Sequence, residues 1–294
     1  MKKITVFTPT YNRAYCLHQL YESLVRQTSQ DFEWLIIDDG STDNTKTLVS
    51  KWITKNKIAI KYVYQENGGM HNAHNTAYQL IETELNVCVD SDDYMPNNAI
   101  QIIINKWNEV SKKENIAGIV GIDVFKDGEI VGTMIPQNLD ISTLHDLYYK
   151  HKITGDKKLV LRTEIVKNYP QYPIFEGERF VPLGVLYLMI DQNYKLACLN
   201  KPLCVVEYLP DGSSRNIFKQ YKTNPKGFRY SRTIELKYIK IFNIRVLKAL
   251  HLISSTLFIG DYQFFKNNPQ KILTIFCLPL GLLFHFYILF KIEK

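Results

Sequence analysis

The sequence lacks a disulfide framework. Its five cysteines are an odd number among 294 residues and show no metal-ligand spacing, which fits a reducing compartment and excludes a small disulfide-stapled secreted domain. A secretory signal is also missing, because Met1-Lys2-Lys3 leads directly into the first apolar segment. We therefore expect the folded part of the chain to face the cytosol.

Acidic residues are scarce in the region 215–248, which holds ten Lys or Arg and a single acid, Glu235. The net charge of +7 comes from this region, since the rest of the chain carries 26 basic and 28 acidic residues. A local basic excess of this kind favours phosphates or an anionic surface. Aromatic residues lie between these cations, but the region leads into an apolar tail that suits a bilayer better than a nucleic acid.

Charged residues are absent from the segment 272–290, which is nineteen residues long. As a helix it would extend about 28 Å, close to the ~30 Å thickness of the hydrocarbon core, and lysines flank it at 266, 271, 291 and 294. Pro279 and Gly281 are expected to kink it. We expect membrane attachment, either across the bilayer or in its interface. The alternative is an apolar helix packed on the rest of the protein or on a second subunit.

The remaining composition is typical of a folded protein, with 46% hydrophobic and 22% charged residues. In the first part of the chain, short apolar runs alternate with segments of helical spacing. The predicted strands are 4–7, 32–37, 58–64 and 86–89, and the predicted helices are 17–25, 45–52 and 71–81. Such alternation implies right-handed crossovers and a mainly parallel sheet. Because each polar loop follows a strand, we expect the loops to gather at one edge.

Later segments are expected to add antiparallel elements to this sheet. An Asp-Gly turn at 126–128 predicts a hairpin between 118–124 and 129–134. The other expected strands are 159–162 and 196–208, the latter interrupted at 200–202, and the other expected helices are 100–110, 142–151 and 183–192.

Three carboxylates, Asp90, Asp92 and Asp93, fall directly after the apolar run 85–89. Charges this crowded repel unless a cation or hydrogen bonds hold them. Hard oxygen ligands at the carboxyl end of a strand suit Mg2+ or Mn2+ shared with substrate phosphates, so a nucleotide diphosphate is the first ligand to expect. The alternative is an acidic turn that caps the helix following Pro96.

The other loops at this edge fit the same ligand. Tyr11 could stack on a base, and Arg13 could bind phosphate. Asp39 could accept the N–H of a pyrimidine ring, and Gly68-Gly69 would let the backbone approach a diphosphate. Each of these residues also has a structural interpretation, as a packed aromatic, a helix cap or a turn.

Four motifs carry a resemblance to a known family. They are Thr-Pro-Thr-Tyr-Asn-Arg at 8–13, the run 27–45, Glu-Asn-Gly-Gly with Ala-His-Asn within 66–75, and Val-Asp-Ser-Asp-Asp at 89–93. In order and spacing they resemble the family 2 glycosyltransferases, inverting enzymes of the GT-A fold. We therefore expect an α/β fold with a Rossmann-like, mainly parallel mixed sheet flanked by helices, followed by a C-terminal helical, basic and apolar extension.

The resemblance implies a nucleotide-sugar donor, usually a UDP-sugar, and a divalent metal, Mn2+ or Mg2+. Asp39 and Tyr11 would lie at the uracil, and Asp90 near the ribose or the sugar. Asp92, with Asp93 as a second ligand, would hold the metal. The full set of implied donor-binding residues is Thr8, Pro9, Tyr11, Arg13, Asp39, Gly69, Asn75, Asp90 and Ser91.

Two histidines, His71 and His74, follow the glycines of the third loop. They are expected at the polar surface or at the start of a helix rather than as metal ligands, because neither has a partner at a suitable spacing. The resembling family often has Arg at the position of His74, so no phosphate contact is assigned there.

A second group of carboxylates lies in the segment 173–182, which contains Glu176 and Glu178. Inverting glycosyl transfer needs a carboxylate that removes the proton of the acceptor hydroxyl while that oxygen attacks the anomeric carbon. The resembling family has a paired acidic motif at this point of the chain, and the base is assigned to Glu178, with Glu176 as the alternative. The simpler interpretation is an exposed turn with Arg179 in a surface ion pair.

The sequence divides into a catalytic domain, 1–214, and a basic helical region with the apolar segment, 215–294. Residues 1–100 would bind the nucleotide, and residues 101–214 the acceptor. In similar enzymes a loop at the position of 209–214 folds over the donor phosphates, and Arg215 and Lys219 suit such a lid. A plain connector is the alternative.

The predicted activity is metal-dependent, inverting transfer of a sugar from a nucleotide diphosphate sugar to an acceptor glycan. The acceptor is expected to be lipid-linked and used for surface polysaccharide, at the cytoplasmic face of the membrane. A nucleotidyltransferase is one alternative, although the first loop lacks a Gly- and Lys-rich phosphate signature. A non-catalytic scaffold that binds a nucleotide-sugar or a membrane is the other. The sugar, the linkage and the oligomeric state do not follow from the sequence.

Overall fold

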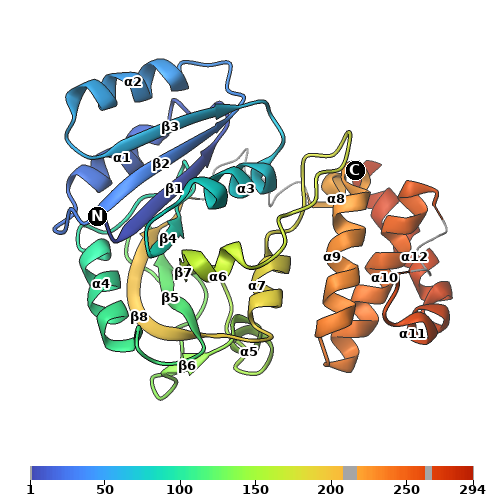
Figure 1. The fold of residues 1–294 in the computed structure, drawn as a ribbon. Helices are drawn as coiled ribbons and strands as arrows, with labels where there is room; N and C mark the ends of the chain where they lie inside the picture. The colour runs from blue at the N-terminus through green and yellow to red at the C-terminus, as the bar shows by residue number, and fades with distance from the viewer. Residues whose placement is uncertain (1, 208–216, 262–266, 294) are drawn as a thin grey trace. The chain divides into compact units, whose positions relative to one another are not determined.

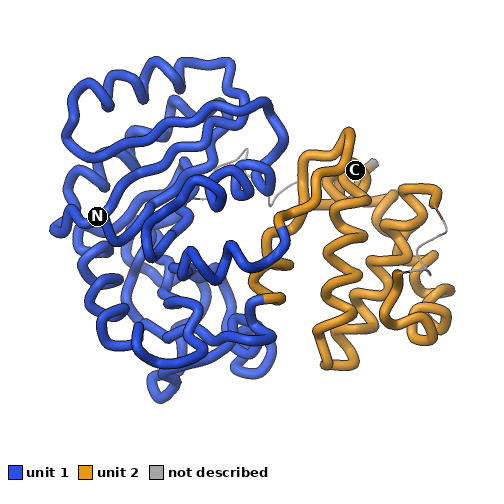
Figure 2. The backbone as a smooth tube through the Cα atoms, in the orientation of Figure 1, with its two compact units in different colours: residues 1–170, 190–209 blue, residues 171–189, 210–294 orange. Residues whose placement is uncertain are grey.

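The chain forms two compact units (Figure 2). The computed structural model describes residues 2–207, 217–261 and 267–293. Unit 1 comprises 1–170 and 190–209, and unit 2 comprises 171–189 and 210–294. The boundary expected at 214 lies outside the described residues. Residues 171–189, expected within the catalytic domain, belong with the C-terminal helices.

Unit 1 is built on one eight-stranded sheet with the order β3-β2-β1-β4-β7-β5-β8-β6 (Figure 1). Its first half is parallel, with β1 Ile4–Thr10, β2 Phe32–Asp39, β3 Ile60–Gln65 and β4 Leu85–Cys88. The helices between these strands are α1 Leu17–Val25, α2 Thr45–Lys55 and α3 Met70–Leu80. The expected alternation of strands and helices is confirmed, because each of these elements forms where the apolar pattern predicts it.

The second half of the sheet is mixed. Its strands are β5 Ile116–Val124, β6 Ile141–Ser142, β7 Lys157–Arg162 and β8 Lys195–Val205, and the helices in this part are α4 Ala99–Val110, α5 Leu144–Tyr149 and α6 Thr163–Lys167. β7 runs antiparallel to both β4 and β5, whereas β8 runs parallel to β5. The register of β8 shifts at Pro202, where an interruption was expected, because proline cannot donate to the ladder.

The hairpin expected around residues 126–128 forms its turn, at Gly128 with φ +88, and a single bridge between Val124 and Ile130. The described part of the segment 129–134 forms no strand. At Gly132, with φ +75, the chain turns away from β5, and the N–H of Thr133 donates to the carbonyl of Thr154 at 3.1 Å. Beyond the segment, Asn200 accepts the N–H of Ile135 at 3.0 Å and donates to the carbonyl of Ile135 at 2.7 Å.

Helices cover both faces of the sheet, which explains why its central strand β1 is buried along its whole length. Ile4 and Val6 of β1 point to the face where α1, α2 and α4 pack. Phe7 points to the other face and contacts Tyr78 of α3, with ring centroids 5.4 Å apart. The central strands are therefore held rigidly, and their carboxyl ends are fixed in position.

Two tryptophans and a tyrosine stack inside this core. The rings of Trp34 on β2 and Trp52 on α2 have centroids 5.8 Å apart, and Tyr21 of α1 lies 4.4 Å from Trp52. Trp34 Nε1–H donates to the hydroxyl of Thr8 at 2.9 Å, so the buried indole has a hydrogen-bond partner. The third tryptophan, Trp107 of α4, is also buried in unit 1.

Unit 2 is helical. Its helices are α8 Ile217–Thr223, α9 Pro225–Tyr238, α10 Phe242–Ile259, α11 Lys271–Phe276 and α12 Leu278–Glu293, with most of α7 Gly184–Ile190. The apolar segment expected at 272–290 is broken at Cys277, between α11 and α12. The break is next to Pro279, one of the two residues expected to kink this segment.

Among the described residues, α10 is the one helix that is long and apolar enough to cross a membrane by length and composition. The core helix of a bundle passes the same test, and the polar residues of α10 are paired within unit 2. Lys248 donates to Glu235 of α9 at 2.7 Å, and Arg232 donates to the same carboxylate at 2.6 Å. Ser254 Oγ lies 3.0 Å from Nδ1 of His285 on α12. These pairs make α10 the centre of the helical unit.

Candidate active site

Asn12 joins the loops that follow β1 and β2. Its backbone has φ +53, a left-handed conformation that Asn adopts more readily than most residues. Its side-chain oxygen accepts the N–H of Thr42 at 2.8 Å, and its own N–H donates to Ser41 Oγ at 2.9 Å. The carboxyl ends of the two strands therefore form a connected rim.

Asp39, at the end of β2, joins this rim to the start of α3. Its Oδ1 accepts the N–H of Gly68 at 2.9 Å and the side-chain amide of Gln65 at 2.7 Å. Its Oδ2 accepts the N–H of Gly69 at 2.8 Å. The structure thus brings together Asp39 and Gly69, which were predicted at the donor. Within the described chain Oδ2 makes this one hydrogen bond, so a second lone pair remains for the N–H of a base.

Gly69 is the N-cap residue of α3, and its φ of +87 disfavours any residue with a side chain. A Cβ on the preceding Gly68 would lie 2.2 Å from Nδ2 of Asn72, so the backbone is closely packed here. The N-terminus of this 11-residue helix lies at the rim, where its N–H groups favour an anion. Asn75, also predicted at the donor, is buried in the same helix.

His71 is the second residue of α3 and His74 lies one turn later, so the expected place near the start of a helix is confirmed for His71. Both side chains are buried, so the polar surface, the other place expected for them, was wrong. Their face of the helix packs against the sheet, where the His74 ring meets Phe7 with centroids 5.1 Å apart. Burial, and then the neighbouring His74, lower the pKa of His71 to about 4, so the ring is neutral at pH 7. Neither ring nitrogen of His71 has a hydrogen-bond partner among the described residues.

The predicted carboxylates form a tight turn after β4, in which the N–H of Asp93 donates to the carbonyl of Asp90 at 3.1 Å. Asp90 and Asp92 are partly exposed, whereas Ser91 and Asp93 are buried. Asp93 Oδ1 accepts the N–H of Glu207 at 3.2 Å. Asp93 therefore ties the turn to the end of β8, while Asp92 is accessible at the rim.

A lysine from β7 supplies positive charge beside this turn. Lys158 lies opposite Gly121 of β5, and its side chain hydrogen-bonds to Cys204 of β8. Burial alone would lower the pKa of Lys158, but four acidic groups outweigh burial and hold this pKa well above its usual value: Asp123, Cys204, Asp93 and Asp90. Burial raises the pKa of Asp93 to about 7, and Lys158 opposes that rise.

Sequence reasoning expected a bound cation near the crowded carboxylates and missed this lysine. The signal was present in the strand Lys-Lys-Leu-Val-Leu-Arg at 157–162, which begins with two lysines before its apolar residues. A lysine in a strand is ambiguous, because half-buried strands alternate polar and apolar residues. Its position next to Asp93 depends on β7 inserting between β4 and β5, which no local pattern predicts.

Asp92 and Arg13 both act electrostatically on the thiol of Cys16, at the start of α1. Burial, and then Asp92, raise the pKa of this thiol to about 11, and Arg13 opposes the rise. Tyr11 is 46% exposed in the same loop. Because β2, β1 and β4 are neighbours in the sheet, the structure gathers five predicted residues at one edge: Tyr11, Arg13, Asp39, Gly69 and Asp92.

Thr8 and Pro9 lie within β1 rather than in the loop after it. The hydroxyl of Thr8 is buried and accepts the N–H of Trp34, and Pro9 pairs with Ile37 of β2. The side chains of these two predicted residues therefore belong to the sheet. The part of this motif that extends beyond the strand begins at Tyr11.

The acidic turn at 90–93 offers carboxylate oxygens to a divalent metal. Among the described residues, no three His, Cys, Asp or Glu side chains form a metal-binding group. Its partly exposed carboxylates are hard oxygen donors, which suit an ion held by one or two carboxylates and completed by substrate phosphates. Asp92 at the rim fits that role. Asp93 fits it less well, because it is buried and its Oδ1 already accepts the N–H of Glu207.

Within unit 2, Glu178 binds the N-terminus of α9. Its two carboxylate oxygens accept the N–H groups of Lys226 and Gly227 at 2.9 and 2.8 Å. Asn224 Oδ1 accepts the N–H of Arg179 at 2.8 Å, which ties the same loop to the helix. These bonds satisfy helix N–H groups that have no intrahelical partner. The predicted base therefore has a fixed position and also a structural role.

The alternative base and the lid were also predicted for this site. Glu176, the alternative base, is exposed in the same loop as Glu178. The predicted lid at 209–214, with Arg215, lies outside the described residues. Lys219, the other cation assigned to that lid, is exposed on α8.

The fold and the rim define an α/β protein whose polar loops gather at the carboxyl ends of parallel strands, the edge where open sheets of this kind bind their ligands. The chain matches the sequence model of Glycosyl transferase family 2 over residues 5–160, and it belongs to that family. It is therefore a glycosyltransferase, and the resemblance carried by its motifs is confirmed.

Two relatives have names that state a polymer. TarP of Staphylococcus aureus strain N315, a poly(ribitol-phosphate) beta-N-acetylglucosaminyltransferase, is 26% identical over 262 residues, which are 84% of this chain and 75% of that protein. A teichoic acid poly(glycerol phosphate) polymerase of Staphylococcus epidermidis is 30% identical over 154 residues. Those residues are 52% of this chain but 20% of the polymerase.

Solved structures share the fold. Residues 1–349 of S. aureus TarS in complex with UDP-GlcNAc give a TM-score of 0.60 at 19% identity, covering 92% of this chain and 82% of that one. The mannosyltransferase PcManGT of Pyrobaculum calidifontis, in complex with GDP-Man and Mn2+, gives 0.56 at 14% identity, covering 95% and 87%. The predicted GT-A fold class is confirmed.

Proposed function

We propose that this glycosyltransferase moves a sugar, with inversion, from a UDP-sugar to an acceptor glycan and that it uses a divalent metal. The observation that carries the proposal is the hydrogen-bonded rim, at which Asp39, Gly69 and Asp92 stand on neighbouring loops. The UDP-GlcNAc bound to TarS and the Mn2+ bound to PcManGT support the donor and the metal, respectively.

The donor would bind across this rim. The ring N–H of uracil would donate to the remaining lone pair of Asp39 Oδ2, and Tyr11 would stack on the base. Arg13 and the N-terminus of α3 would face the diphosphate. Asp90, partly exposed beside Asp92, would accept from a hydroxyl of the ribose or of the sugar.

Asp92 would hold the Mn2+ or Mg2+ ion, with Asp93 as the second predicted ligand. Bound there, the ion would neutralise the charge that develops on the departing diphosphate. Lys158 would keep the neighbouring carboxylates from repelling one another when the site is empty, because its charge lies close to Asp90 and Asp93.

The transfer step needs a base on the acceptor side. The acceptor oxygen would attack the anomeric carbon while the bond from that carbon to the diphosphate breaks, and its electron pair would leave with UDP. The hydroxyl proton would pass to Glu178, with Glu176 as the alternative base. The hydrogen bonds from Lys226 and Gly227 would hold the Glu178 carboxylate in one orientation.

We further propose that the acceptor is a lipid-linked glycan or a polyol-phosphate polymer destined for the cell surface, modified at the cytoplasmic face of the membrane. The named activities of TarP and of the teichoic acid polymerase support an acceptor of this chemistry. The exposed cations of region 215–248, which among the described residues are Lys219, Lys222, Lys237 and Lys240, suit a phosphate-bearing acceptor or an anionic surface.

Calorimetry and a transfer assay test the reaction. UDP, GDP and dTDP would be titrated into the protein with Mn2+, with Mg2+ and with chelator, and transfer would be followed with radiolabelled UDP-sugars. We expect Asp92→Asn to fold normally but to lose metal-dependent binding and transfer. Asp127→Asn, a matched change in an exposed turn, should behave as the wild type.

Three outcomes would overturn parts of this proposal. Wild-type turnover by Asp92→Asn would reject the metal assignment. Release of pyrophosphate in place of UDP would indicate a nucleotidyltransferase. Binding of UDP-sugars without transfer to any glycan acceptor or to water would indicate a non-catalytic scaffold.

A further inference from the structure

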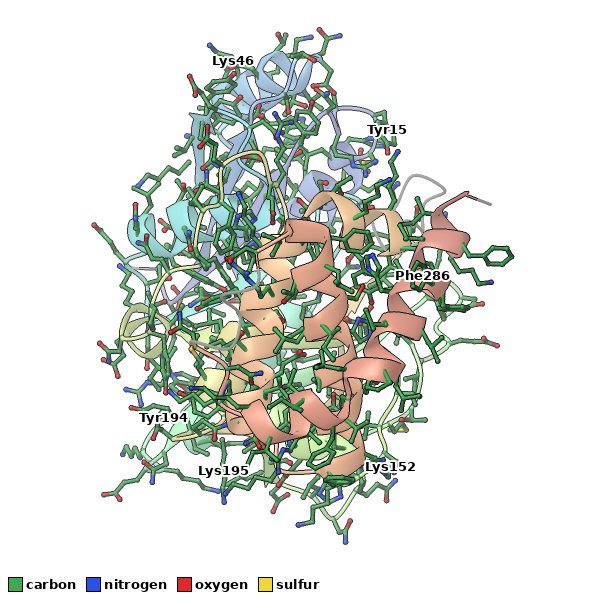
Figure 3. The ribbon with its side chains drawn as sticks, turned by 90° about the vertical axis from the view of Figure 1, so that its right-hand side faces the viewer. Tyr15, Lys46, Lys152, Tyr194, Lys195 and Phe286 are labelled. Atoms are coloured by element: carbon green, nitrogen blue, oxygen red, sulfur yellow. The ribbon has the colours of Figure 1, made fainter. Side chains whose placement is uncertain are left out.

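Exposed apolar side chains recur along α11 and α12 at helical spacing. Each is between 44% and 79% exposed: Ile272, Ile275, Phe276, Leu280, Leu282, Leu283, Phe286, Tyr287 and Phe290. Within α12, steps of three and four residues place Leu280, Leu283 and Phe290 on the same side of the helix as Phe286, which Figure 3 labels. We call this set the apolar face. An exposed surface of this kind marks an interaction site.

The opposite side of α12 packs on α10. Ile288 is buried, and a Cβ on Gly281 would lie 2.6 Å from Cδ1 of Ile253, so the two backbones approach closely there. The hydrogen bond between Ser254 and His285 adds a polar link between the helices. Unit 2 therefore holds the apolar face in a fixed orientation.

We propose that the apolar face docks on an anionic lipid bilayer, with α11 and α12 lying in the plane of the interface. α12 has 16 residues, so it is about 24 Å long, which is less than the ~30 Å hydrocarbon core. A spanning α12 would either separate from α10, exposing Ser254 and His285 to lipid, or carry α10 and the ion pair of its Lys248 with Glu235 into the bilayer. An interfacial position keeps these contacts and buries the side that is exposed.

Lysines at the two ends of the apolar face favour an anionic surface. Lys271 and Lys291 are exposed at its two ends, and Lys291 Nζ lies 5.7 Å from the ring centroid of Tyr287. Further exposed cations lie on α8, on α9 and in the loop after α9: Lys219, Lys222, Lys237 and Lys240. Apolar and aromatic residues on one side of a helix, with lysines at the edges, are typical of helices that bind anionic membranes.

A second copy of the chain fits the apolar face less well. In a two-fold contact the same patch of each subunit meets its rotated copy, so Lys271 and Lys291 would need acidic partners within the patch. Residues 271–293 hold one acid, Glu293 at the end of α12, against two lysines. A bilayer supplies the further negative charge that this segment lacks. This inference does not depend on the metal or the base proposed above, and it agrees with a lipid-linked acceptor.

Vesicle flotation of the full chain tests the proposal. The protein would be mixed with vesicles of phosphatidylcholine alone, or of phosphatidylcholine with phosphatidylglycerol. We expect it to float with the anionic vesicles and to lose that binding in Phe286→Asp with Leu283→Asp. Ile53→Asp, at an exposed apolar residue of α2, is the matched control and should float as the wild type does. Far-UV circular dichroism of each variant would verify that it is folded.

The lysines form a second arm of this test. We expect Lys271→Glu with Lys291→Glu to lower affinity for anionic vesicles by about fivefold or more per lysine, since each cation near such a surface contributes ~1 kcal/mol. Lys126→Glu, at an exposed turn of unit 1, should have no comparable effect. Equal binding of wild type and the apolar-face variant, or no binding by either, would overturn the proposal. The proposal would also be overturned if the wild type did not bind vesicles but formed a concentration-dependent oligomer that Phe286→Asp dissociates.

The in-plane orientation has its own measurement. Nitroxide labels on Ile272→Cys, Leu283→Cys and Phe290→Cys would report depth through their accessibility to oxygen and to a water-soluble paramagnet. Helices lying in the interface place all three labels at a similar shallow depth. A label at position 283 much deeper than the other two would instead show a spanning helix.

Discussion

The N–H of Gly69 donates to Oδ2 of Asp39 at 2.8 Å, and this bond fixes the start of α3 against the end of β2. Asp39 accepts hydrogen bonds from Gln65, Gly68 and Gly69. Asp39→Asn would remove the negative charge and place an NH2 group, which cannot accept a hydrogen bond, against at least one of these donors. We expect UDP affinity to fall by about ten- to a hundredfold, since a hydrogen bond to a charged group is worth about 1.5–3 kcal/mol. Calorimetric titration measures the change. Asp140→Asn, at an exposed position, is the control, and unchanged affinity in Asp39→Asn would exclude Asp39 from the base site.

The raised pKa of Asp93 predicts a pH-dependent stability. Burial raises this pKa from 3.8 to about 7, so the folded chain binds the proton more tightly than the unfolded chain does. The free energy of unfolding of the metal-free protein should therefore fall as the pH rises through that window, by up to about 4 kcal/mol. Asp93→Asn keeps an oxygen for the N–H of Glu207 and should flatten the dependence. Denaturant unfolding from pH 4 to pH 8 measures it, and parallel curves for both proteins would contradict the assignment.

Lys158 should stabilise the carboxylates around it. Lys158→Met leaves these acids without their counter-charge, which we expect to cost about 3–5 kcal/mol of folding free energy. The loss should be larger at pH 8 than at pH 5, because protonation relieves the repulsion at low pH. Urea titrations at the two pH values test this. Lys126→Met, on an exposed turn, is the control and should leave the free energy of unfolding nearly unchanged. If Lys158→Met is as stable as the wild type, Lys158 does not stabilise these carboxylates.

Glu178 combines two roles that substitution can separate. In Glu178→Gln only one side-chain oxygen remains for two N–H groups, so α9 should lose about 1 kcal/mol, while transfer should fall by about 10²- to 10⁴-fold with UDP binding retained. Gly227→Ala disturbs the same contact but keeps the carboxylate, since its Cβ would lie 2.1 Å from the carbonyl oxygen of Phe180. If Glu178→Gln and Gly227→Ala keep similar residual transfer activity while Glu176→Gln is inactive, the catalytic base is Glu176 and not Glu178.

The first half of the fold followed from the sequence because its signals are local. Apolar runs of four to eight residues, each followed by turn formers, predict parallel strands with polar loops at one edge. Tyr11, Asp39, Gly69 and Asp92 then lie together through topology alone, and the structure places them so.

The second half depends on partners far apart in the chain. β7 inserts antiparallel between β4 and β5, which is why the counter-charge of Lys158 could not be predicted. The side chain of Asn200 hydrogen-bonds to the backbone of Ile135, a residue 65 positions earlier. Glu178 binds the start of a helix 48 and 49 residues later. Pairings of this range leave no periodic signal in the sequence.

The stack of Trp34, Trp52 and Tyr21 has a practical consequence for spectroscopy. All three tryptophans of the chain lie in unit 1, so indole emission follows the melting of the sheet and does not register the helical bundle. Ellipticity at 222 nm reports both units at once. A gap between the two melting curves would therefore measure how independently the catalytic sheet and the helical unit unfold, without any engineered probe.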